Sequence, residues 1–124
     1  MRLLITVLAL ILSSCSTENK PFQPPQGVEG GWKLTTSAPA QGPEWMQRLG
    51  VKQGFTASYA GPVDTVAEFY ELKSDASALE CMQLWRGEKS ESRFYKRNLF
   101  VVLRSSHPNR EMLMDFSRAL QKTL

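Results

Sequence analysis

The sequence is poor in the residues that most catalytic and metal sites need. Its 124 residues include one histidine, His107, and two cysteines, Cys15 and Cys81. Zinc and copper sites normally draw on several such ligands, so we expect no metal and no other cofactor. The G-x-S-x-G pattern of serine hydrolases is absent, the acidic residues are dispersed, and no glycine-rich loop joins a strand to a helix. The sequence therefore predicts no enzyme.

Long hydrophobic runs and a strong charge of one sign are also missing. The longest apolar run covers residues 3–12. A helix of that length spans roughly 15 Å, about half of a bilayer's hydrocarbon core, so no membrane-spanning helix is predicted. The formal net charge is only +3, and we expect no nucleic-acid partner. Hydrophobic residues make up 42% and charged residues 22%, values typical of one folded domain.

The N-terminus has the features of an export signal in their usual order. Arg2 precedes the apolar run 3–12, which matches the apolar core of a signal peptide. The run ends in Leu12-Ser13-Ser14-Cys15. This tetrapeptide resembles the lipobox of bacterial lipoprotein precursors, in which an aliphatic residue and two small residues precede an obligatory cysteine. The alternatives are an ordinary secretory signal that contains a cysteine and a buried N-terminal strand, which the following polar stretch disfavours.

The resemblance implies a lipid anchor at the cell envelope. In that family a diacylglyceryl group is attached to the cysteine sulfur through a thioether, and a signal peptidase cuts before the cysteine. Carried over, residues 1–14 are a signal peptide recognised at Leu12, Ser13 and Ser14, and Cys15 carries the lipid. Two or more acyl chains hold a protein stably on a membrane. In bacteria with two membranes, an aspartate directly after the lipidated cysteine favours retention at the inner membrane. This chain has Ser16 at that position, which favours the periplasmic face of the outer membrane.

Residues 15–31 are predicted to be the lipidated cysteine and a flexible tether. The segment is rich in proline and glycine, which remove backbone donors and raise the entropy cost of ordering. A chain of this length has a root-mean-square span on the order of 20–25 Å. The alternative is a loop folded onto the domain through Phe22.

Residues 32–124 are predicted to form a single α+β domain. The expected order is a strand at 32–36, a short helix at 43–49, strands at 54–60 and 63–72, a helix capped by Ser74 and continuing to Arg86, strands at 93–96 and 99–103, and a helix opening at Pro108. Hairpins separated by helices predict an antiparallel sheet with helices packed on one face, a two-layer sandwich. Neither face of the strand at 63–72 is cleanly apolar. Cys81 lies in an apolar helical stripe, and we interpret it as a core residue, whereas His107 is interpreted as a turn or cap residue.

Positive charge is concentrated in the last third of the chain. Residues 15–85 carry five lysines and arginines against eight acidic residues, whereas residues 86–124 carry nine against four. Six of these cations are close in sequence: Arg86, Lys89, Arg93, Lys96, Arg97 and Arg104. We interpret them as a candidate contact with an anionic surface, either lipid headgroups or an acidic envelope polymer. The alternative is an ordinary solvated hairpin.

Together these features predict a lipid-anchored envelope protein with a small non-catalytic binding or scaffolding domain. Its expected partners are the membrane, through the N-terminal lipid, and an envelope protein or anionic surface. The alternative is a small-ligand-binding or sensing accessory subunit of an envelope complex. A pocket lined by Trp45, Tyr59, Tyr70 and Trp85 would favour that alternative. The oligomeric state stays open.

Overall fold

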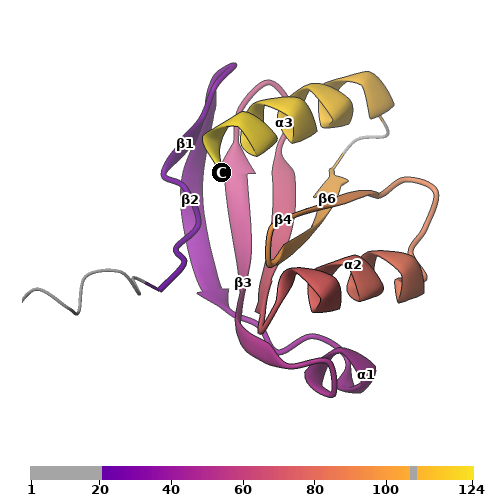
Figure 1. Cartoon of the computed structure of the whole chain (residues 1–124). Coiled ribbons are helices and arrows are strands. Elements are labelled where there is room, and N and C mark those ends of the chain that lie inside the picture. Colours follow the sequence, from indigo (N-terminus) through magenta and orange to yellow (C-terminus); the bar gives the residue numbers. More distant parts are fainter. Residues whose placement is uncertain (1–20, 107–108) are drawn as a thin grey trace, which may run out of the picture.

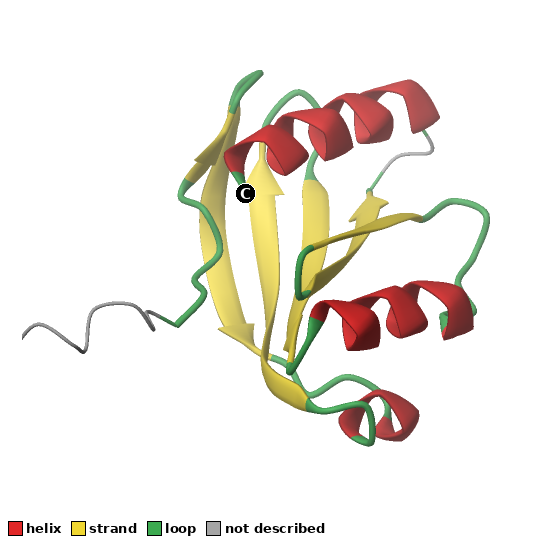
Figure 2. Cartoon of the chain, in the orientation of Figure 1, coloured by secondary structure: helices red, strands yellow, loops and turns green. Residues whose placement is uncertain are grey.

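The computed structural model describes residues 21–106 and 109–124, which form a six-stranded antiparallel sheet with three helices. The strands are β1 (Gly27–Val28), β2 (Trp32–Pro39), β3 (Val51–Ala60), β4 (Thr65–Leu72), β5 (Ser92–Lys96) and β6 (Leu99–Ser105), and the helices are α1 (Glu44–Gln47), α2 (Asp75–Leu84) and α3 (Arg110–Thr123). The strand order is β1-β2-β3-β4-β6-β5 (Figures 1 and 2). The predicted α+β class and antiparallel sheet are confirmed.

The neighbouring strands β4 and β6 are buried on both faces. In their register Phe69 lies opposite Val101, and Tyr70 lies opposite Phe100. Successive side chains of a strand point to opposite faces, so these two pairs enter different cores. All four side chains are almost completely buried. This explains why neither face of the strand around residues 63–72 is cleanly apolar.

Two hydrophobic cores therefore flank the sheet. The first contains Val28, Trp32, Ala57, Tyr59, Val63, Ala67, Phe69, Phe94, Val101, Leu103, Leu113, Phe116 and Leu120. The second contains Met46, Tyr70, Leu72, Ala78, Cys81, Phe100 and Val102. Helix α3 contributes only to the first core, whereas α1 and α2 contribute only to the second.

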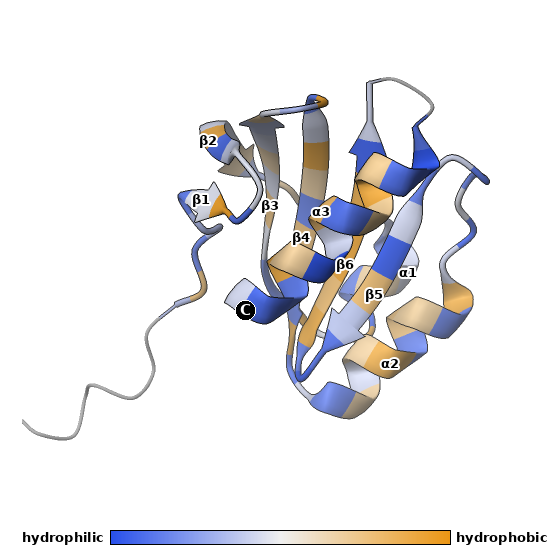
Figure 3. Cartoon of the chain, turned by 90° about the horizontal axis from the view of Figure 1, so that it is seen from above, coloured by the Kyte–Doolittle hydropathy of each residue, from blue (hydrophilic) through white to orange (hydrophobic). Residues whose placement is uncertain are grey.

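The predicted packing of all helices on one face of a two-layer sandwich is not what the structure shows. The sheet curls into a half-barrel, with α3 against one face and α1 and α2 against the other (Figure 1). Viewed from above, β5 lies between α3 and α2 (Figure 3). The physical reason is the near-continuous apolar run of β6, which requires a cover on both sides.

Residues 21–31 belong to the folded body, so the tether prediction is wrong for this stretch. The Phe22 ring lies 5.1 Å from the ring of Phe69, and the Tyr59 hydroxyl donates to the Pro25 carbonyl at 2.8 Å. Val28 is buried in the first core and pairs with Trp32 across the β1–β2 ladder. The proline-rich composition does not prevent docking, because side chains of the sheet satisfy the segment's carbonyls. Residues 15–20 lie outside the described residues.

The predicted start of one helix is confirmed by its cap, whereas the other helix starts at a different residue. The Ser74 hydroxyl accepts from the Ser77 amide at 3.1 Å, which confirms the predicted start of α2. Helix α3 begins at Arg110 rather than at Pro108. Its cap is Asn109, whose side-chain oxygen accepts from the Met112 amide at 3.0 Å. His107 and Pro108 lie outside the described residues.

Candidate functional site

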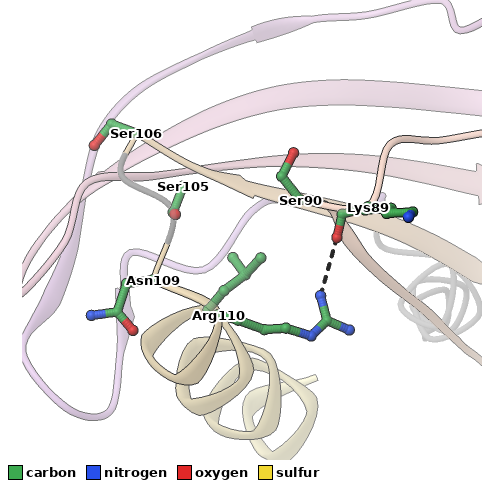
Figure 4. A pocket seen from close by; sticks show the side chains of 7 residues that line it. Lys89, Ser90, Ser105, Ser106, Asn109 and Arg110 are labelled. Atoms are coloured by element: carbon green, nitrogen blue, oxygen red, sulfur yellow. Dashed lines mark hydrogen bonds between the residues drawn. The ribbon is translucent and has the colours of Figure 1, made fainter.

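Three cavities cluster at the end of the sheet where β3 and β6 finish and α3 begins, which we call the cavity end. The first, about 300 Å³, is lined by Lys89, Ser90, Ser105, Ser106, Asn109, Arg110 and Leu113 (Figure 4). The second, about 460 Å³, is lined by Thr35, Ser58, Tyr59, Ala60, Asp64, Thr65, Val66, Arg104, Ser105 and Ser106. The third, about 450 Å³, is lined by Gly61, Pro62, Val63, Asp64, Ser106, Asn109 and Met112. Ser106 borders all three.

The lining of the first cavity consists largely of hydrogen-bond donors. Lys89 and Arg110 each carry a positive charge, and none of the seven lining residues is acidic. The three serines carry hydroxyl groups, of which that of Ser106 donates to the Asp64 carbonyl at 3.3 Å. Arg110 Nη1 donates to the Lys89 carbonyl at 3.2 Å, which ties the start of α3 to the loop before β5 (Figure 4). Leu113 gives the cavity one apolar wall. Such a lining suits a polar or anionic group better than an apolar one.

An ion-pair network lies beside the second cavity. Arg104 of β6 pairs with Glu68 of β4 through Nη1 and with Glu91 through Nε. The Glu91 side chain is only 6% exposed. Burial by itself lowers the pKa of Arg104, but the hydrogen bonds and attraction from Glu68 and Glu91 outweigh it, so the pKa is raised. Arg104 therefore stays charged.

Two neighbours complete this network. The Tyr70 hydroxyl donates to Glu68 Oε1 at 2.7 Å, and the Trp85 indole N–H donates to Glu91 Oε1 at 3.2 Å. Burial, together with the hydrogen bond to Glu68, raises the pKa of the Tyr70 hydroxyl. Each carboxylate thus accepts hydrogen bonds from several donors, and the network fastens the loop after α2 to the sheet. Its geometry is that of a structural brace.

The structure distributes the six predicted contact cations over different surfaces. Lys89 lines the first cavity, whereas Arg104 is engaged by its two carboxylates. Lys96 Nζ and Arg97 Nη2 donate, each at 2.6 Å, to the carbonyls of Gln121 and Leu124 at the end of α3.

Arg86 and Arg93 are exposed, after α2 and on β5 respectively. Strand β5 extends roughly 17 Å and ends at Lys96, which therefore lies well away from Lys89 before the start of the strand.

Trp45, Tyr59, Tyr70 and Trp85, whose common pocket would favour the ligand-binding alternative, do not line one cavity in the described structure. Tyr59 lies in the first core, with its ring 5.3 Å from that of Phe116. Tyr70, Trp45 and Trp85 pack in or against the second core. Side chains on opposite faces of a sheet cannot line a common pocket.

Cys81 is buried in the second core, which confirms its interpretation as a core residue. Burial, assisted by the charge of Glu80, raises the pKa of its thiol to about 11. The thiolate, which is the reactive form, is therefore scarce at neutral pH.

Sequence reasoning missed Ser105, Ser106, Asn109 and Arg110 as lining residues. The available signal was their position, since polar residues between a buried strand and a helix lie at the end of a sheet. Their partners Lys89 and Ser90 come from a different loop, and only the β5–β6 pairing brings the two segments together.

Comparisons with protein-family models, with curated proteins and with solved structures gave no match for this chain. Within residues 21–106 and 109–124, no helix has the length and apolar character needed to cross a bilayer. In the same described part of the chain, no group of three or more histidine, cysteine or acidic side chains could hold a metal ion. Leu12, Ser13, Ser14 and Cys15 lie outside it.

Proposed function

We propose that this protein is a lipid-anchored cell-envelope protein whose folded body is a non-catalytic binding or scaffolding module. The lipobox resemblance at Leu12-Ser13-Ser14-Cys15 supports the anchor. The observation that carries the binding role is the first cavity, a space of about 300 Å³ whose lining includes Lys89, Arg110 and three serines and no acidic residue. A partner presenting a carboxylate, phosphate or dense hydroxyl groups matches that lining.

The proposal of binding rather than catalysis is supported by the state of the two carboxylates of the ion-pair network beside the second cavity. Glu68 and Glu91 both pair with Arg104, and each accepts a further hydrogen bond from an aromatic side chain. A general base needs a carboxylate that can reach a substrate proton. These two carboxylates are already occupied by donors of the protein itself.

The anchor is tested by replacing Cys15 with alanine in the full chain. Expression with labelled palmitate should label the wild type and leave Cys15→Ala unlabelled, because the replaced sulfur is the proposed attachment atom. Cys81→Ala is the matched control, since it removes the other cysteine, and it should keep the label. Equal labelling of Cys15→Ala and wild type would contradict the anchor.

The binding role is tested by photo-crosslinking in intact envelopes. A photoreactive amino acid placed at Ser90, on the cavity wall, should capture a reproducible neighbour that mass spectrometry identifies. Ser37 is the matched control, because it is an exposed serine of β2 that lines none of the three cavities. The same neighbour at both positions, or none at Ser90, would argue against a partner at the first cavity.

The second candidate function is a small-ligand-binding or sensing accessory subunit. The cluster of three cavities around Ser106 favours it, since ligand sites are concave and combine apolar walls with a few polar groups. The two candidates differ in the crosslinking result. A captured protein supports scaffolding, whereas a small molecule that co-purifies with the chain, seen by native mass spectrometry, supports ligand binding.

A further inference from the structure

The body has a second distinct end, opposite the cavities. Here β3 begins at Val51, β4 ends at Leu72, and the β5–β6 hairpin turns. The Leu72 amide donates to the Asn98 carbonyl at 2.8 Å, and Asn98 Nδ2 donates to the Leu72 carbonyl at 2.9 Å. These contacts place the hairpin turn beside the end of β4. We call this region the exit end.

The chain that leads back to Cys15 leaves the body at the exit end. Gln53 Nε2 near the start of β3 donates to the Phe22 carbonyl at 3.2 Å and to Glu71 Oε1 at 2.9 Å. From Phe22 the chain runs along the first-core face to β1, which pairs with β2 near the cavity end. The first residues that the structure describes therefore lie toward the exit end, and the indigo start of the ribbon is well away from the start of α3 (Figure 1).

The covalent length of the chain between Cys15 and the body limits how far the body can move from an anchor. Six residue steps separate Cys15 from Pro21, and such a chain extends at most about 20 Å. Gln53, which holds the Phe22 carbonyl, is two residue steps from the start of β3 and seven steps, roughly 23 Å, from its end at Ala60. An anchor at Cys15 thus holds the exit end closer to the lipid than the cavity end.

Exposed cations surround this exit. Lys52, Lys73 and Arg97 are exposed at the exit end. The Lys73 amide donates to the Gly50 carbonyl at 2.8 Å, and its side chain lies over Gly50, which places it beside the start of β3.

Acidic residues are also present at this end of the body. Glu71 is half-buried and accepts from the Gln53 amide group, and Asp75 is in the first turn of α2. Lysine and arginine close to an anionic bilayer are attracted to it.

We infer that the exit end faces the lipid surface, with Lys52 and Lys73 directed at the phosphate headgroups of anionic lipids. The cavity end then opens away from the membrane, where a partner can reach Lys89 and Arg110. This orientation rests on the proposed lipid anchor. It combines two observations, where the described chain begins and how short the chain back to Cys15 is. The exposed lysines of the exit end suit an anionic lipid surface, although the cavity end carries exposed cations too, among them Lys33, Lys89 and Arg110.

The orientation is tested on the full lipidated chain in vesicles of phosphatidylethanolamine and phosphatidylglycerol that contain a lipid with a nitroxide on its headgroup. A thiol-reactive fluorophore is attached in Lys52→Cys at the exit end. The matched control is Lys33→Cys, an exposed strand lysine that pairs with Ala60 at the cavity end. Fluorescence should be lost at position 52 and retained at position 33. Wild type with the same reagent measures the background from buried Cys81.

The possible results separate the orientation from the anchor. Equal loss at both positions, or greater loss at position 33, overturns the orientation while the anchor stands. Replacing phosphatidylglycerol with phosphatidylcholine should weaken the loss at position 52, and an unchanged signal overturns the role of the cations. Vesicle flotation and palmitate labelling of the same samples report on the anchor, and a chain that neither floats nor labels overturns both proposals.

Discussion

Replacement of Phe116 by alanine should lower the free energy of unfolding by about 3–5 kcal/mol, the usual cost of emptying a buried aromatic site. Phe116 is completely buried on α3, and its ring lies 5.0 Å from that of Trp32 and 5.3 Å from that of Tyr59. It therefore joins α3 to β2 and β3 across the first core. Urea denaturation followed by circular dichroism measures the change.

The control for this variant is Lys122→Ala, an exposed substitution on the same helix. It should change the free energy of unfolding by less than about 0.5 kcal/mol, as surface substitutions usually do. A loss for Phe116→Ala as small as that of the control would mean that α3 does not close the first core.

Replacement of Arg104 by methionine should lower the free energy of unfolding by about 3 kcal/mol, because it leaves the buried Glu91 carboxylate without its cation. Methionine keeps much of the side-chain volume, so the loss reports on charge rather than on a cavity. The double variant Arg104→Met/Glu91→Gln should recover part of the stability. It removes the unpaired charge, and the amide oxygen can still accept from the Trp85 indole.

Arg93→Met is the matched control for this network. Arg93 is an exposed arginine on the adjacent strand β5. Its replacement should change the free energy of unfolding by less than about 0.5 kcal/mol. A similar loss for Arg93→Met and Arg104→Met, or no recovery in the double variant, would contradict the role of the ion pairs.

The Arg104 network links stability to the candidate site. Glu91 accepts from the Glu88 amide at 3.1 Å and from Trp85, so it holds both ends of the loop that carries Lys89 and Ser90. That loop forms one wall of the first cavity, and the start of α3 forms another. The shape of the first cavity therefore depends on the ion pairs of Arg104, whose residues do not line that cavity.

Much of the fold could be predicted from local patterns. The Gly61-Pro62 turn between two β-rich stretches predicts the β3–β4 hairpin, and the polar turn at 96–98 predicts the β5–β6 hairpin. Ser74 marks the start of α2 because a serine hydroxyl can replace a missing helical hydrogen-bond partner. These features are decided by neighbours in sequence.

Local sequence patterns could not predict which sheet faces the helices cover or that residues 21–31 pack on the body. The alternation in β4 has apolar side chains on both faces, and alternation alone cannot say whether one helix layer or two will cover them. Residues 21–31 have the composition of a linker. Their docking depends on Tyr59 and Gln53, which are about thirty residues distant in sequence.

The candidate site was predicted only in part. Lys89 was identified from its charge, and it does line a cavity. The six cations are close in sequence, which suggested a single contact surface. In the structure, strand β5 lies between Lys89 and Lys96, and Arg104 is paired with Glu68 and Glu91. Arg110 was not singled out, because its contact with the Lys89 carbonyl depends on how α3 lies over the sheet.

The sequence by itself determined the α+β class, the hairpins and the start of α2, and it carries the lipobox resemblance, because each depends on residues within a short stretch of chain. Only the tertiary structure decided which faces the helices cover, that residues 21–31 join the body, and that the cavities and the chain exit lie at opposite ends. Those features arise from contacts between segments distant in sequence, where burial of apolar surface and pairing of buried charges outweigh local preference.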